Sequence, residues 1–315
     1  MIHRIPSGTR DVLPDEMREL RAITDAIRAV FEQHGYGEVW TPAIEYEDVL
    51  RRVDGAAPPA YRVFDDHGEV LALRPDMTVP IARLAATRYA TADPPLRFSY
   101  QAHAYRAVHP HRGQMREFLQ AGIELIGAPG AEGTAEALTV LCRALDATGL
   151  ATYRIGLGDA ALYPALLAAL DVPPESRETL LGALGARDLV ALEREVERLG
   201  ADETLVRVPQ MRGGADVLDA PAGPVADAVA GLRAVLALLE PAVAGRVIFD
   251  LGLARGLGYY TGAVFDVYDP ALGEPLGGGG RYDDLLGRFG RDLPAVGFAL
   301  GVDRLHLALA GEEGR

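Results

Sequence analysis

One segment of the chain gathers cationic side chains in a stretch that also contains proline and glycine. Residues 105–116 read YRAVHPHRGQMR, so Arg106 and Arg116 flank two histidines. Arginine's fixed fork of donors suits a phosphate or a carboxylate, and a loop of this composition is therefore a candidate anion clamp. A solvated hairpin tip also fits the composition. His109 and His111 do not indicate a metal site, because no third ligand follows at a recognisable spacing.

A second segment places two polar side chains on one face of a predicted strand. Residues 116–124 read REFLQAGIE, and alternate residues of a strand share a face, so Gln120, Gly122 and Glu124 lie together. Because Gly122 has no side chain, the two polar groups would stand over a floor with room for a small ligand. An exposed sheet face explains the same pattern.

Two glycine-rich segments follow. RGLGYYTG, at 255–262, combines glycines, which allow close backbone approach, with Tyr259 and Tyr260, whose rings form flat walls with a hydrogen-bonding tip. Ordinary core packing would also account for these tyrosines. The glycine run at 277–280, which precedes Tyr282, is interpreted as either an anion-binding nest or a flexible turn.

Composition and charge exclude several classes of protein. The 315 residues carry 45 acidic and 31 basic side chains, for a formal charge of −14, and none is lysine. Chemistry that needs a lysine amine, such as P-loop nucleotide binding or a Schiff base, is therefore excluded. The single cysteine, Cys142, rules out an internal disulfide and a multi-cysteine zinc site, and we expect it to be a small buried apolar residue.

The sequence also indicates the cellular compartment of the protein. It contains neither an apolar run of the ~20 residues that a membrane span needs nor the apolar N-terminal stretch of a signal peptide. We therefore expect a cytoplasmic protein with no membrane partner. The acidic balance argues mildly against a nucleic-acid partner, although a local basic patch would still permit one.

Hydrophobic periodicity predicts the elements that must hold these side chains. Helices are expected at 15–34, 78–89 and 134–150, and strands at 38–45, 70–73 and 151–159. Two long strands, at 96–108 and 116–126, are expected to form an antiparallel hairpin. The end of the chain reads as strand, turn and helix. Without a strict βαβ rhythm, this pattern predicts an α+β fold with a mostly antiparallel sheet.

Residues 159–244 differ in character from the rest. They are rich in Ala, Leu and Glu, with helical patterns and few strand signals. We interpret them as a helical insertion with a small core of its own. Residues 1–158 and 245–315 would then form one core domain that contains the candidate site.

Segments spread over nearly the whole chain occur in the order found in one known family. The opening of that family is similar to PSGTRDVLPDE, and its first motif is similar to GYGEVWTPAIE. Its second motif is similar to YRAVHPHRGQMREFLQAGIELIG, and its third is similar to GFALGVDRL. RGLGYYTG and GGRYDDL are similar to stretches of its histidine-specific members. The chain thus resembles the core of class II aminoacyl-tRNA synthetases, specifically histidyl-tRNA synthetase. This implies a mostly antiparallel sheet flanked by helices, with Arg304 placed over an adenine.

Several positions depart from the synthetase pattern. Val108 stands where those enzymes have a glutamate that accepts the adenine amino group, and Gln114 where they have a phosphate-binding arginine. Valine has no acceptor to offer, and a neutral amide binds a triphosphate more weakly than a cation does. Gly258 replaces the aspartate of RGLDYYTG. We therefore expect nucleotide activation to be impaired.

RPDMT at 74–78, followed by VPIARLAA, is instead similar to a non-catalytic branch of this family, the regulatory subunits of short-form ATP phosphoribosyltransferase in histidine biosynthesis. The chain ends soon after Arg304, whereas an anticodon-binding domain needs on the order of 100 residues, so we expect that domain and a tRNA partner to be absent. The resemblance implies a chain that is not itself an enzyme. It would form a homodimer through its first motif, activate the catalytic subunit within a hetero-octamer, and confer feedback inhibition by L-histidine.

The same resemblance implies a histidine pocket without a metal or a cofactor. Acidic groups near an ammonium, arginines facing a carboxylate and aromatic walls around an imidazole agree with the chemistry of that ligand. The implied residues are Asp76, Thr78, Gln120 and Glu124 at the ammonium, Arg106 and Arg255 at the carboxylate, and Tyr259, Tyr260 and Tyr282 at the imidazole.

Two other functions remain open at this point. One is an active histidyl-tRNA synthetase core or a stand-alone amino-acid ligase that forms an adenylate, which histidine-dependent exchange of pyrophosphate into ATP would reveal. The other is a pure scaffold, which would bind no free histidine.

Overall fold

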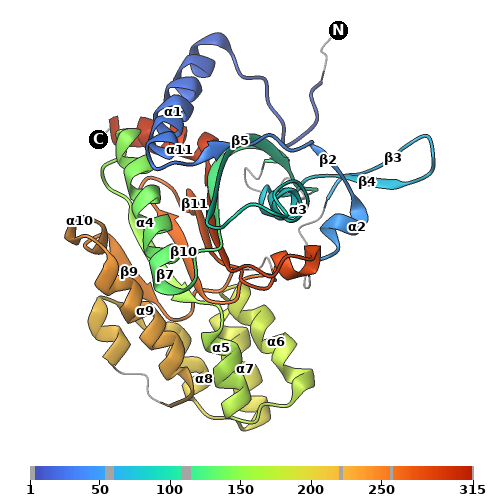
Figure 1. Ribbon diagram of the computed structural model, residues 1–315. Helices are drawn as coiled ribbons and strands as arrows, with labels where there is room; N and C mark the ends of the chain where they lie inside the picture. Colours follow the sequence, from blue (N-terminus) through green and yellow to red (C-terminus); the bar gives the residue numbers. More distant parts are fainter. Residues whose placement is uncertain (1–3, 54–59, 108–114, 220–222, 256–257, 314–315) are drawn as a thin grey trace.

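A large, mostly antiparallel sheet organises the computed structural model, which describes residues 4–53, 60–107, 115–219, 223–255 and 258–313. Among these residues, nine strands form the sheet in the order β1-β5-β6-β12-β11-β10-β7-β9-β8, and only the β1–β5 and β7–β9 pairs are parallel (Figure 1). The sheet confirms the predicted α+β class. The strands are β1 (Gly37–Glu38), β5 (Leu96–Tyr105), β6 (Glu117–Ile126), β12 (Ala295–Gly301), β11 (Gly277–Arg281), β10 (Ala263–Tyr268), β7 (Arg154–Asp159), β9 (Val247–Asp250) and β8 (Arg212–Gly213).

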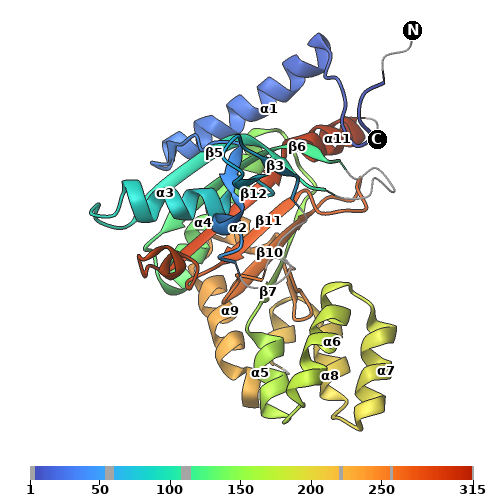
Figure 2. The same cartoon turned by 90° about the vertical axis from the view of Figure 1, so that its right-hand side faces the viewer.

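Helices cover both faces of this sheet. On one face lie α1 (Pro14–Gln33), α4 (Gly130–Ala147) and α11 (Val302–Glu313), and on the other lies α3 (Thr78–Arg88), as Figures 1 and 2 show together. Ile123 and Leu125 of β6 belong to the core beneath α1 and α4. Because alternate residues of a strand face opposite sides, Glu124 points towards α3.

The segment that leads into α3 is fastened by a buried arginine. Arg74 donates from Nε to the carbonyl of His103 at 2.9 Å and from Nη1 to the carbonyl of Thr41 at 2.6 Å. These bonds join the segment to β5 and to the chain before a small second sheet. That sheet has the order β2-β4-β3, with β2 (Ile44–Tyr46), β4 (Val70–Leu73) and β3 (Arg62–Phe64). A short helix, α2 (Glu47–Leu50), follows β2.

The glycine run at 277–280 is neither a nest nor a turn, so that interpretation is wrong. These residues form β11, between β10 and β12. A Cβ on Gly279 would overlap the carbonyl oxygen of Gly297 on β12, and a Cβ on Gly278 would overlap the guanidinium of Arg255. The glycines are therefore required by close approach within the sheet rather than by turn geometry.

Residues 159–244 are mainly helical, but they have no separate core. The buried side chains of this segment belong to the same cluster as those of α1 and α4, and β8 extends the large sheet. The expectation of an independent core is wrong because α9 packs directly on α4. The α-helices are α5 (Leu162–Ala169), α6 (Pro174–Gly185), α7 (Leu189–Leu199), α8 (Thr204–Arg207), α9 (Ala226–Leu238) and α10 (Pro241–Ala244).

Short 3-10 helices complete the described elements: η1 (Val208–Gln210), η2 (Ala215–Asp219), η3 (Gly223–Val225) and η4 (Leu286–Phe289). Within the described ranges, no helix combines the length and apolar composition needed to cross a bilayer.

Candidate functional site

A buried carboxyl group lies at the centre of the candidate site. Glu124 on β6 is 1% exposed and accepts a hydrogen bond from Oγ1 of Thr78 at 2.8 Å and another from the hydroxyl of Tyr282. Burial raises the pKa of Glu124 to about 8, although these two hydrogen bonds act in the opposite direction. The group is therefore largely protonated at pH 7 unless a cation joins it.

A second buried carboxyl group, Asp76, stands at the start of α3. Its Oδ1 accepts from the backbone N–H of Val79 at 3.3 Å. Burial raises the pKa of Asp76, while this hydrogen bond and the positive charge of Arg106 partly oppose the rise. The negative charge of Asp76 contributes in turn to the raised pKa of Glu124. Two carboxyl groups that disfavour each other's ionisation form a site that a cationic group would stabilise.

Arg106 brings a cation to the same region from the end of β5. Its guanidinium lies over the ring of Phe118, 4.9 Å from the centroid, and its Nε donates to the carbonyl of Pro75 at 3.4 Å. Burial lowers the pKa of Arg106, and the facing Asp76 works against that shift. Acidic and basic groups thus stand side by side, as a zwitterionic ligand requires.

Gln120 presents an acceptor that the protein does not satisfy. The residue is 8% exposed, and its Oε1 is buried with no hydrogen-bond donor among the described residues. An unsatisfied buried acceptor costs roughly 1–3 kcal/mol. A donor on a ligand would remove that cost, and the predicted position of Gln120 beside an ammonium fits this need.

Aromatic rings form the wall next to Glu124. Tyr259 and Tyr260 have ring centroids 4.8 Å apart, and Tyr259 and Tyr282 meet edge to face at 5.7 Å. Burial raises the pKa of Tyr282 well above its usual value, so its hydroxyl remains a donor. These rings could bound a flat heterocycle.

The space predicted over Gly122 is not open. Tyr100 lies directly opposite on β5, and a Cβ on Gly122 would stand 2.5 Å from the Tyr100 hydroxyl oxygen. The expectation of room for a ligand there is wrong, because the cross-strand neighbour fills it. Tyr100 is thus a site residue that sequence reasoning missed. The register of the predicted hairpin, which pairs it with Gly122, was the available signal.

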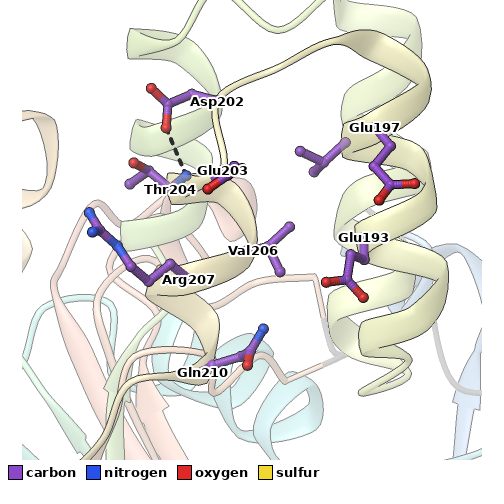
Figure 3. A pocket seen from close by; sticks show the side chains of 9 residues that line it. Glu193, Glu197, Asp202, Glu203, Thr204, Val206, Arg207 and Gln210 are labelled. Carbon is purple, nitrogen blue, oxygen red and sulfur yellow. Dashed lines mark hydrogen bonds between the residues drawn. The ribbon is translucent and has the colours of Figure 1, made fainter.

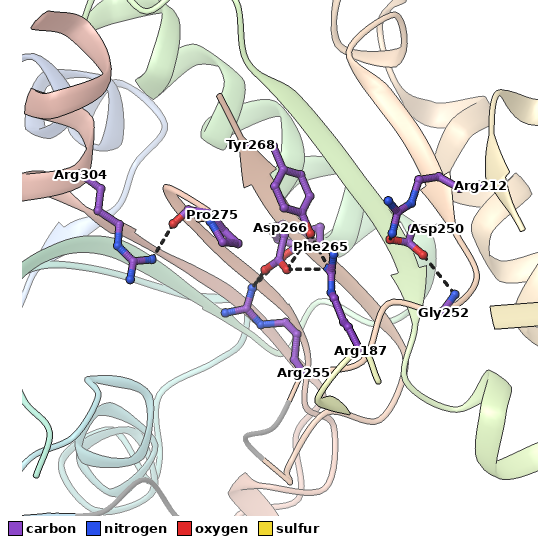
Figure 4. A network of polar contacts seen from close by, with 10 residues as sticks. All are labelled: Arg187, Arg212, Asp250, Gly252, Arg255, Phe265, Asp266, Tyr268, Pro275 and Arg304. Carbon is purple, nitrogen blue, oxygen red and sulfur yellow. Dashed lines mark hydrogen bonds and ion pairs between the residues drawn. The ribbon is translucent and has the colours of Figure 1, made fainter. Parts of the chain in front are cut away.

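Arg255 joins the site through its contact with Tyr260, with its guanidinium 5.7 Å from the ring centroid. It forms an ion pair with Asp266 of β10 and donates to the carbonyl of Phe265 at 2.9 Å (Figure 4). Asp266 was also missed, although a charged residue inside the apolar strand AVFDVY is a recognisable signal.

The structure thus connects eight of the nine predicted residues by contacts or close charges, and it places Gln120 on the same face of β6 as Glu124. Gly258 is exposed with φ +68°, a conformation that favours glycine. Arg304 donates to the carbonyl of Pro275 at 2.6 Å and pairs with Glu274 at 2.7 Å. Val108, His109, His111 and Gln114 lie outside the described residues.

A hollow lies between α7 and α8, away from the candidate site. Its volume is about 580 Å³, and Figure 3 shows the acidic side chains Glu193, Glu197, Asp202 and Glu203 around it. No cluster of three or more His, Cys, Asp or Glu residues able to hold a metal ion occurs in the described part of the chain.

Comparison with known proteins identifies the family of the chain. The family model described as Histidyl-tRNA synthetase matches residues 8–305. A structure from Bacillus halodurans, described as an ATP phosphoribosyltransferase regulatory subunit/histidyl-tRNA synthetase, is 32% identical with a TM-score of 0.90, covering 98% of this chain and 84% of that one. The fold and the family model together define a histidyl-tRNA synthetase-like protein of class II architecture.

A curated relative narrows the assignment. The ATP phosphoribosyltransferase regulatory subunit of Symbiobacterium thermophilum is 44% identical, covering 97% of this chain and 79% of its own length. The corresponding protein of Anaeromyxobacter dehalogenans is 41% identical, covering 99% of this chain and 93% of its own length. The chain belongs to the family of ATP phosphoribosyltransferase regulatory subunits.

Proposed function

We propose that this chain is the non-catalytic regulatory subunit of a cytoplasmic short-form ATP phosphoribosyltransferase and that its pocket senses L-histidine. On this proposal the chain activates the catalytic subunit in the first step of histidine biosynthesis. Occupation of the pocket then changes the activity of the assembly. Linkage requires histidine to bind two states of the assembly unequally, and a coupling of ~1–3 kcal/mol corresponds to roughly 5–150-fold in affinity.

One observation carries the sensing role: a buried, mutually destabilising pair of carboxyl groups stands beside a buried arginine and an aromatic wall. Asp76 and Glu124 suit the α-ammonium, and Arg106 suits the carboxylate. The rings of Tyr259 and Tyr282 suit the imidazole. Histidine supplies each of these groups, and its ammonium would also offer a donor to Gln120.

Calorimetric titration of the purified chain with L-histidine tests this assignment. We expect saturable binding that Glu124→Ala weakens at least tenfold, since the variant loses the carboxylate and the bonds from Thr78 and Tyr282. Glu178→Ala, which removes an exposed carboxylate from α6, is the matched control and should bind like the wild type. Absence of heat at millimolar histidine would contradict the sensing role and favour a scaffold.

The non-catalytic assignment has its own test. Histidine-dependent exchange of labelled pyrophosphate into ATP should stay at background, whereas clear exchange would overturn the assignment in favour of an adenylate-forming enzyme. Adding the short catalytic subunit should raise ATP phosphoribosyltransferase activity, and histidine should then lower it in the wild type but not in the Glu124→Ala complex.

For the assembly, we propose a homodimer within a hetero-octamer. Exposed apolar side chains occur between β1 and β2, where Trp40 is 90% exposed, and on β2 itself, where Ile44 and Tyr46 are about half exposed; these residues are the candidate interface surface. Aromatic residues are enriched at protein interfaces, and this surface lies in the segment that resembles the first motif. It supports a dimer that uses β1 and β2.

A further inference from the structure

One carboxylate on the far side of the site is shared by two arginines from different parts of the chain. Asp266 on β10 is 9% exposed. Its Oδ1 pairs with Nη1 of Arg255, whose guanidinium lies over the ring of Tyr260 in the candidate site, while its Oδ2 lies 3.8 Å from Nη2 of Arg187. Figure 4 shows both guanidinium groups reaching Asp266, with Tyr268 beside them.

Arg187 comes from the turn between α6 and α7, in the segment at 159–244. Its Nη2 donates to the hydroxyl oxygen of Tyr268 at 2.6 Å, and that hydroxyl donates to Oδ2 of Asp266 at 3.2 Å. The backbone of Arg187 has φ +54°, which is uncommon for a residue other than glycine. The turn therefore holds an unfavourable conformation while its side chain contacts the sheet.

The position of Arg255 depends on the same carboxylate. Its Nη1 lies between Asp266 and the carbonyl of Phe265, directly over Gly278, where any Cβ would overlap it. The Tyr268 hydroxyl donates to Oδ2 of Asp266, and the Arg187 guanidinium lies 3.8 Å from the same oxygen. Together they leave Oδ1 for Arg255 and fix how the carboxylate is turned. Both groups also offset part of the negative charge of Asp266. Less of the positive charge of Arg255 is then neutralised by Asp266, and more of it acts on a ligand.

We propose that Arg187 is a positioning residue for the ligand-carboxylate arginine. Through Asp266, docking of the α6–α7 turn on the sheet and occupation of the pocket strengthen each other. This inference rests on the proposed histidine site and adds the element that senses its occupation. Because coupling is reciprocal, docking of the turn tightens ligand binding by the same factor by which the bound ligand favours docking.

The experiment compares two ligands that differ only at the carboxylate. L-histidine and L-histidinol, in which a hydroxymethyl group replaces the carboxylate, are titrated into wild type, Arg187→Ala and Tyr268→Phe. Since the Arg187 side chain is half exposed and screened by solvent, we expect a moderate effect. Both variants should bind histidine about three- to tenfold more weakly and histidinol within twofold of wild type.

The matched control is Arg194→Ala, which removes an exposed arginine from α7 and should leave both affinities unchanged. Hydrogen exchange gives an independent measurement: histidine should slow exchange of residues 183–191 in the wild type and not in Arg187→Ala. Equal weakening of both ligands, or unchanged histidine affinity in Arg187→Ala, would overturn the inference and leave the proposed function intact. A wild type that binds no histidine would overturn both.

Discussion

At the scale of single residues, the unusual feature is Glu124, an acid with no counter-ion in contact with it among the described residues. Its raised pKa, about 8, arises from burial, and the two hydrogen bonds that it accepts only reduce the rise. A carboxyl group that is neutral at pH 7 must lose its proton before it can form an ion pair with a cationic ligand. On the proposed function, binding of histidine at this site is therefore linked to proton release.

This linkage predicts a pH dependence of ligand affinity. The free pocket has its Glu124 pKa near 8, and an ammonium beside the carboxylate lowers that pKa. At pH values between the bound and free pKa values of Glu124, the bound state carries fewer protons. Affinity for histidine should therefore rise with pH, by up to tenfold per unit, until about pH 8. Titration calorimetry in buffers of different ionisation enthalpy measures the released proton directly.

Two amide variants separate this effect from other titrations, including that of the ligand's imidazole. Glu124→Gln should bind weakly with no proton release from the pocket. Asp159→Asn is the control: burial raises the pKa of Asp159 to about 6, but its contact is with the backbone N–H of Ala161. A pH dependence that persists in Glu124→Gln and disappears in Asp159→Asn would contradict the prediction.

At the scale of elements, regular patterns were readable from the sequence and close approaches were not. Helical spacing predicted α1 to within one residue at each end, and alternation predicted that Gln120 and Glu124 share a face of β6. The structure shows that this face is buried and not exposed. Alternation says nothing about what stands opposite, however, so Tyr100 over Gly122 was missed. Arg187 was missed because the contact between the α6–α7 turn and β10 spans about 80 residues of sequence.

The glycine strand β11 leads to a prediction about stability. A side chain at Gly279 would overlap the backbone of β12 at Gly297 and Phe298, and a backbone cannot move aside as a flexible side chain can. Gly279→Ala should therefore lower the free energy of unfolding by ~1–3 kcal/mol or more. Urea denaturation followed by circular dichroism provides the measurement.

The control for this substitution is another glycine of the same chain. Gly182 lies in α6 with open space where a Cβ would stand, so Gly182→Ala should stabilise the protein by ~0.5–1 kcal/mol through helix propensity. Glycine-to-alanine changes of opposite sign would show that packing, and not backbone entropy, decides at β11. A Gly279→Ala variant as stable as the wild type would refute the account of the strand.

At the scale of the whole molecule, the proposed dimer makes the single tryptophan a reporter of assembly. Trp40 is 90% exposed in one chain, and Tyr46, on the following strand β2, is also exposed. If the β1–β2 surface is buried between two chains, tryptophan emission moves to shorter wavelength as the protein is concentrated, because the indole leaves water.

Tyr46→Asp places a charge in that interface and should yield monomers with long-wavelength emission, since an unpaired buried charge is costly. Analytical ultracentrifugation measures the mass in parallel. Leu238→Asp, at an exposed leucine of α9, should leave mass and emission unchanged. A dimer that survives Tyr46→Asp with unshifted Trp40 emission would place the interface elsewhere on the chain.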